Sequence, residues 1–225
     1  MTIHYILLLV SLLITIGAQI YVNSSYSKYS KVKISSGKTG AEIAREILDT
    51  EGLGHISVQE THGILSDHYN PSSKAVYLSS SNYYGTSIGA SSVAAHECGH
   101  AIQDKEKYVF MNIRAALVPF VNFSSYAGYF AILLGCLFSS LDLIWLGIGA
   151  EFVILLFQLI TLPVEFNASK RALKVLETNN YLTKKEISGG KTVLRAAALT
   201  YVASVATTIL EIARLILIYG GRRDD

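Results

Sequence analysis

The sequence LIWLGIGAEFVILLFQLITL, residues 143–162, decides the fold class. It contains a single charged residue, Glu151, and it is long enough to cross the hydrocarbon core of a bilayer, which takes about 20 residues of α-helix. Three further runs of similar length are also predominantly apolar: Ile3–Val22, Leu117–Leu137 and Leu199–Tyr219, the last of which carries Glu211 and Arg214. The whole chain is 51% hydrophobic, whereas soluble domains contain roughly 45–50%. The sequence therefore predicts a mainly α, multi-pass membrane protein with about four transmembrane helices.

The first apolar run is expected to remain as an N-terminal transmembrane anchor, residues 1–22. A cleaved signal peptide carries basic residues before its apolar core. Here the lysines follow the run instead, at Lys28, Lys31 and Lys33. An uncleaved anchor fits this order of charges better.

The segment after the anchor reads as a soluble region with helices and strands. Thr39-Gly40-Ala41-Glu42 fits a capping box and predicts a helix start. Ile56–Glu60 and Ala75–Ser79 are short runs with β-branched or aromatic residues, which predict strands, and Ser66–Pro71 is expected as a loop between them. Small and apolar residues at helical spacing predict another helix from about Thr86 to Asp104.

The strongest chemical signal lies on this last helix, at His96-Glu97-Cys98-Gly99-His100. Residues four apart share one face of a helix, so both imidazoles can point at one ion, and neutral imidazole suits zinc. Glu97 is rotated by about 100° from His96, so it can face a water molecule beside the ion. The pattern predicts His96 and His100 as zinc ligands and Glu97 as the catalytic base. Cys98 is rotated by about 200° from His96 and is not expected to bind the ion.

A catalytic zinc site takes a third protein ligand and keeps one position open. No histidine follows the motif, so a glutamate from a later helix is expected. Glu165 is best placed, because it follows Pro163 at the end of an apolar run. Ala168 and Ala172 would also allow a close approach between its helix and the motif helix. The other candidates are Glu177 and Glu186, with Glu151 and Glu211 inside apolar runs.

Several stretches resemble the YugP-type neutral zinc metallopeptidases, which are membrane-bound. The three most specific are Leu65–Pro71, His96–Gln103 and Thr161–Ser169, and Leu117–Pro119 and Ala196–Ala203 are also similar. The resemblance covers nearly the whole chain. It implies a neutral zinc peptidase of the gluzincin type.

The resemblance also implies Glu165 as the third ligand, with one Zn²⁺ per chain. The chain departs from the family pattern at Asn167, where the family has aspartate. If this residue orients a ligand histidine, an amide does so less strongly than a carboxylate.

The resulting hypothesis is a metalloendopeptidase with a small α+β, zincin-like catalytic region at the membrane surface. Zinc would activate water, and Glu97 would take the proton and pass it to the leaving amine. His68 or Tyr69 would donate a hydrogen bond to the oxyanion, although for His68 a local bond to Asp67 is an equal alternative. By resemblance to zincins, Ala75–Ser79 is expected as an exposed edge strand that holds an extended substrate; the alternative is that this strand pairs on both sides within the fold.

Two alternatives remain beside this hypothesis. One is a non-catalytic membrane scaffold that retains a metal site. The other is an intramembrane protease, which is disfavoured because the polar residues 103–107 follow the motif directly.

The distribution of charge predicts the topology. Every lysine and arginine except Arg214, Arg222 and Arg223 falls in residues 23–116 or 163–198. The positive-inside rule therefore places both of these segments in the cytoplasm and both termini outside. The active site is then expected on the cytoplasmic side of the cell membrane.

The chain is thus divided into five segments. These are the anchor 1–22, the catalytic region 23–116, a transmembrane hairpin 117–162, soluble helices with the third ligand 163–198, and a C-terminal transmembrane helix and tail 199–225. The expected partners are the lipid bilayer and a polypeptide substrate, such as loops or tails of membrane proteins. The net charge of +2 says little about partners, but the absence from the sequence of a dense basic stripe with interleaved aromatic residues argues against nucleic acid.

Overall fold

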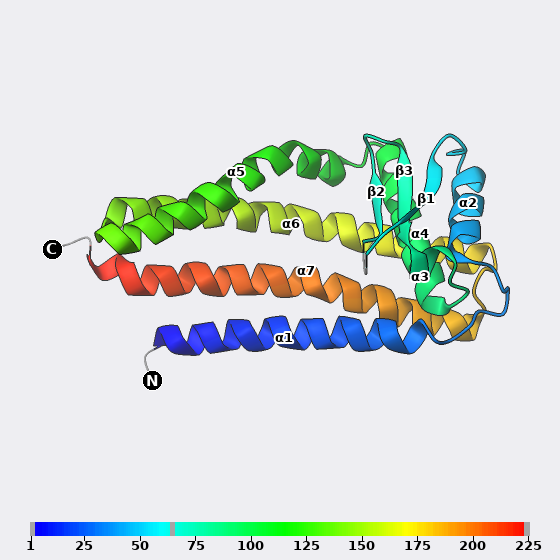
Figure 1. Ribbon diagram of the computed structural model, residues 1–225, viewed down its shortest axis with the longest axis horizontal. Coiled ribbons are helices and arrows are strands. Elements are labelled where there is room, and N and C mark those ends of the chain that lie inside the picture. Colours follow the sequence, from blue (N-terminus) through cyan, green and yellow to red (C-terminus); the bar gives the residue numbers. More distant parts are fainter. Residues whose placement is uncertain (1–2, 64–65, 223–225) are drawn as a thin grey trace. The chain divides into compact units, whose positions relative to one another are not determined.

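The computed structural model describes residues 3–63 and 66–222 (Figure 1). Over this part of the chain, the fold is mainly helical with a small three-stranded sheet. Leu65 and Arg223, which the sequence analysis used, lie outside the described residues. The chain divides into two compact units, residues 20–111 with 163–199, and residues 1–19 with 112–162 and 200–225.

Four of the helices in the described residues are long and apolar enough to cross a membrane. They are α1 (Ile3–Tyr29), α5 (Val109–Phe138), α6 (Leu141–Thr178) and α7 (Lys184–Tyr219). Each extends beyond the apolar run that the sequence indicates, because polar helical residues continue it.

Helix α6 runs through Pro163 without a break, where the sequence predicts a kink or a new helix. A proline removes one helical N–H donor, but the residues on both sides stay helical. Helix α7 begins at Lys184, because Thr183 and Glu186 form reciprocal side-chain to backbone hydrogen bonds at its start.

The sheet has the strand order β1-β3-β2, with β1 (Ser57–Thr61), β2 (His68–Asn70) and β3 (Ala75–Ser79). β3 pairs with β1 in parallel and with β2 in antiparallel register. The prediction of β3 as an exposed edge strand is therefore wrong, since both of its edges are hydrogen-bonded. The predicted loop at Ser66–Pro71 is also partly wrong, because His68–Asn70 completes the sheet as an edge strand.

The core of the unit that contains the sheet lies between helices α2 (Gly40–Thr50) and α4 (Ile88–Lys105) and the strands, which lie beside α4 in Figure 1. The predicted capping box at Thr39 and Glu42 is present, with both reciprocal hydrogen bonds. The apolar face of α2 is fully buried, as its spacing predicts, through Ile43, Ile47 and Leu48. A short helix, α3 (Ser80–Tyr83), connects β3 to α4.

Helices α4 and α6 approach each other closely at Gly99. A Cβ atom on Gly99 would lie 2.8 Å from the backbone oxygen of Ala168, so only glycine fits here without movement. Ala168 and Ala172 are both buried. Small residues on both helices therefore bring the backbone of the motif helix against the segment that carries Glu165.

Candidate metal centre

Three side chains from two helices converge in the unit that contains the sheet. His96 and His100 come from α4, and Glu165 comes from α6; one nitrogen or oxygen atom of each lies within 4.8 Å of the others. His100 and Glu165 are buried, and His96 is nearly so, with 14% of its side chain exposed. Residues that are 69 positions apart in the sequence thus meet because α4 and α6 pack at Gly99.

The distances between these atoms fit a tetrahedral zinc ion. Glu165 Oε2 lies 3.3 Å from Nε2 of His96 and 3.6 Å from Nε2 of His100. Two ligands that are each about 2.0–2.1 Å from a tetrahedral zinc ion are roughly 3.3–3.4 Å apart. The donor set of two imidazoles and one carboxylate is also a common one for catalytic zinc.

The ionisation of the cluster reflects its mutual contacts. Burial raises the pKa of Glu165, but the hydrogen bonds from His100 and then His96 outweigh it, so the pKa lies well below its ordinary value. Burial lowers the pKa of His100, but its contact with Glu165 and the negative charge of Glu97 outweigh burial and raise it. The carboxylate form of Glu165, which a cation needs as ligand, is therefore strongly favoured.

Each histidine makes a second contact through Nδ1. Nδ1 of His100 lies 3.0 Å from Oε1 of Gln103, and Nδ1 of His96 lies 3.2 Å from the hydroxyl of Ser169. The sequence analysis missed both partners. A signal was available, because Gln103 lies three residues after His100 and Ser169 lies four residues after Glu165, and both spacings place side chains on one helix face.

Glu97 is buried beside the cluster and does not belong to it. Its Oε2 accepts a hydrogen bond of 3.0 Å from the backbone N–H of Tyr69, on the edge strand β2. Among the described residues, no hydrogen-bond partner is found for Oε1 of Glu97. The carboxylate is thus held at one oxygen by the sheet.

The structure does not bring His68 to the cluster. Its Nδ1 lies 2.8 Å from the backbone oxygen of Ser66, and its ring stacks on Tyr77. Successive residues of a strand point to opposite faces. Tyr69 points towards α4, where its hydroxyl donates to Asp104 at 2.6 Å, so His68 lies on the other face.

The other predicted candidates lie elsewhere or point away. Glu186 accepts hydrogen bonds from Ser35 and Thr183, Glu211 pairs with Arg214, and Glu177 is exposed. Cys98 is buried in the core, with its thiol 3.6 Å from the backbone oxygen of Ala44, as its rotation on the helix predicts.

The comparisons with known proteins agree with the resemblance noted in the sequence. Residues 4–220 match the protein family described as "Putative neutral zinc metallopeptidase". The chain is 47% identical to the "Putative membrane protease YugP" of Bacillus subtilis (strain 168) over 208 residues, which are 92% of each protein. No solved structure gives a significant match. The chain therefore belongs to the neutral zinc metallopeptidase family.

Proposed function

We propose that this protein is a membrane-embedded, zinc-dependent metalloendopeptidase with Glu97 as the general base. The observation that carries the proposal is the cluster of His96, His100 and Glu165, in which the carboxylate oxygen of Glu165 lies 3.3 and 3.6 Å from the two imidazole nitrogens, close to the ligand separations at a tetrahedral zinc ion. Family membership over residues 4–220 supports zinc and peptide hydrolysis independently of the geometry.

The roles of the chain's own residues follow from their positions. When bound, zinc supplies Lewis acidity towards water and the scissile carbonyl. His96, His100 and Glu165 would hold the ion. Glu97 accepts a proton from the attacking water and delivers it to the leaving amine. The backbone N–H of Tyr69 donates to the same carboxylate and keeps it oriented during both transfers.

A role for His68 as a hydrogen-bond donor to the substrate stays a prediction. Its ring would first have to leave its stack on Tyr77 and its contact with Ser66. A His68→Ala variant that retains full kcat and KM would remove His68 from the mechanism.

The membrane setting is also part of the proposal. In the described residues, four helices long and apolar enough to span a bilayer support a multi-pass protein, and the homologue from Bacillus subtilis is described as a membrane protease. The zincin-like region then lies at the cytoplasmic membrane surface, where the basic residues of 23–116 and 163–198 favour it. Polypeptides close to that surface, such as loops and tails of membrane proteins, are the expected substrates.

The decisive experiment separates metal binding from hydrolysis. Purified protein should contain one zinc per chain, and His96→Ala, His100→Ala and Glu165→Ala should each lose it. Glu97→Gln should keep the zinc but cleave unstructured polypeptides about 10²–10⁴ times more slowly, which is the usual cost of removing a general base. Zinc binding without any hydrolysis by the wild type would favour the alternative of a non-catalytic scaffold.

A further inference from the structure

We propose that Gln103 is a positioning residue that fixes the tautomer of His100, and that Asn167 and the Arg171–Glu106 ion pair hold Gln103 in place. The proposal deepens the function proposed above and rests on it, because it concerns how the chain prepares one zinc ligand. It starts from a continuous series of hydrogen bonds that leads from His100 to the protein surface.

The amide of Gln103 is fully buried and has a defined orientation. Its Nε2 lies 2.8 Å from the backbone oxygen of Val164 and 3.0 Å from Oδ1 of Asn167. A backbone carbonyl can only accept a hydrogen bond, so the group that faces Val164 must be the NH₂. The oxygen of the same amide therefore faces His100.

This orientation decides which nitrogen of His100 carries the proton. The amide oxygen of Gln103 lies 3.0 Å from Nδ1 of His100 and can only accept. Nδ1 must then be the donor, and a neutral imidazole keeps its lone pair on Nε2. Nε2 is the atom that lies 3.6 Å from Glu165 Oε2, so the free lone pair is on the side of the cluster. A second hydrogen bond of this kind orients most metal-binding histidines.

Asn167, where the resemblance implies an aspartate, is the next member of the series. Its Oδ1 accepts hydrogen bonds from Nε2 of Gln103 and, at 2.6 Å, from Nε of Arg171. Gln103 and Arg171 both donate to the same oxygen, Oδ1, and the side chains of asparagine and aspartate both carry such an oxygen. Asn167 therefore acts on His100 through Gln103, and aspartate is not required at this position for that purpose.

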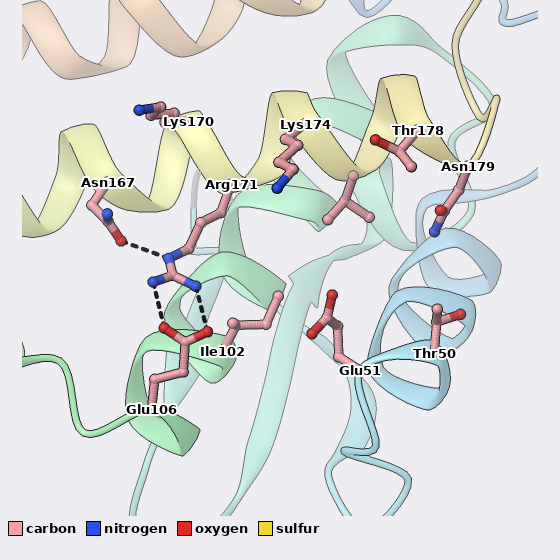
Figure 2. A pocket seen from close by; sticks show the side chains of 11 residues that line it. Thr50, Glu51, Ile102, Glu106, Asn167, Lys170, Arg171, Lys174, Thr178 and Asn179 are labelled. Atoms are coloured by element: carbon pink, nitrogen blue, oxygen red, sulfur yellow. Dashed lines mark hydrogen bonds and ion pairs between the residues drawn. The ribbon is translucent and has the colours of Figure 1, made fainter.

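The series ends at an ion pair on the surface. Arg171 donates to both carboxylate oxygens of Glu106, at 2.9 and 2.5 Å, at one side of a pocket of about 440 Å³ (Figure 2). Half of the Glu106 side chain is exposed, and pairs in such contact with water typically contribute about 0–1 kcal/mol. Gln103 should therefore affect the orientation of His100 most strongly, Asn167 less strongly, and Glu106 least.

His96 lacks such a determined partner. The Ser169 hydroxyl at 3.2 Å from its Nδ1 can donate or accept a hydrogen bond, so it does not select a tautomer. The two histidine ligands should consequently differ, with His100 prepared before the metal arrives.

The test measures zinc affinity by competition with a chromophoric chelator, and the visible spectrum of the Co²⁺-loaded protein. Gln103→Leu keeps the size of the side chain but removes its polar atoms, and it should weaken zinc binding by about 10–100-fold, as is usual for lost outer partners. Its Co²⁺ spectrum should also change, because His100 is no longer held in one orientation. Gln59→Leu is the matched control, since Gln59 is exposed and contacts Ser57; it should leave both readouts unchanged.

Asn167 supplies a conservative rescue. Asn167→Asp keeps the accepting oxygen and should bind zinc like the wild type, whereas Asn167→Leu should lose affinity, by less than Gln103→Leu. If Gln103→Leu does not fold, the difference between the two Asn167 variants still decides. The inference would be overturned if folded Gln103→Leu, or Asn167→Leu, had the same zinc affinity and Co²⁺ spectrum as the wild type. If the wild-type protein binds zinc but hydrolyses no polypeptide, only the proposed function is affected.

Discussion

Replacing Gly99 by alanine would test whether the contact between α4 and α6 sets the geometry of the metal centre. The added Cβ would lie 2.8 Å from the backbone oxygen of Ala168, 0.6 Å short of the 3.4 Å at which ordinary contact begins. Its other close neighbours are also backbone atoms of Ala168, at 3.2 and 3.3 Å. A side-chain rotation cannot relieve this clash, so the two helices must separate.

The separation reaches the metal centre directly. Glu165 lies one helical turn before Ala168 and moves with it, whereas His96 and His100 stay on α4. A displacement of about 0.6 Å exceeds the roughly ±0.2 Å within which metal–ligand distances are normally held. Overpacking of this kind costs about 1–3 kcal/mol, which corresponds to a loss of roughly 5–150-fold in zinc affinity if it falls on the bound state.

The assay is zinc affinity by chelator competition, with thermal unfolding of the zinc-free protein recorded in parallel. The control is Gly149→Ala on α6, the helix that carries Glu165, because a Cβ at Gly149 has no atom within 4 Å. It should leave zinc affinity unchanged. If folded Gly99→Ala binds zinc as tightly as the wild type, the close approach at Ala168 does not position Glu165, and the reasoning fails.

Three further predictions concern topology, metal removal and pH. Cysteines introduced near Lys38 and Lys185 should not be labelled by reagents added outside intact cells, whereas a cysteine near Ser140 should be labelled. The reverse pattern would show that the proposed membrane topology is inverted. Removing zinc should lower the unfolding temperature, because free zinc at 1,000 times its Kd stabilises the folded state by about 4 kcal/mol; an unchanged melting curve would contradict a resident ion. Burial raises the pKa of Asp104, but hydrogen bonds from Lys74 and Tyr69 outweigh burial and hold this pKa below its ordinary value of 3.8. The ionised carboxylate therefore stabilises the fold at pH values above 3.8. This stabilisation is lost as the pH falls through the lowered pKa. Asp104→Asn should therefore cost on the order of 1 kcal/mol at pH 7 and weaken the acid dependence of unfolding, whereas equal acid sensitivity in both proteins would exclude Asp104 as a source.

The three members of the candidate metal cluster could be predicted because most of their signal is local. The spacing of His96 and His100 puts both on one helix face, and Glu165 follows an apolar run as part of a helix with small residues. The structure brings all three together. The capping box at Thr39 and the burial of Ile43 were predictable for the same reason, since both depend on residues within one turn.

The features that were missed depend on contacts between distant segments. β2 has only three residues between Asp67 and Pro71, and its hydrogen bonds come from β3, so no alternation within it marks a strand. β3 was predicted as an edge by analogy with zincins that bind substrate along the strand before the metal helix, and its own residues do not indicate that it is paired on both sides. The need for glycine at position 99 likewise becomes visible only once Ala168 lies against it.

The origin of the ligands on α4 and α6 has a consequence for biosynthesis. His100 leaves the ribosome 65 residues before Glu165, and at about 5–20 residues per second this interval lasts roughly 3–13 s. During that time the nascent chain has two of its three ligands, and the missing carboxylate comes from the helix that begins at Leu141. For the proposed peptidase, hydrolytic competence would therefore be delayed until most of the polypeptide has been made, and the growing chain would not be exposed to its own active site. Stalled chains of increasing length should acquire zinc-dependent protection from proteolysis only after Glu165 has emerged.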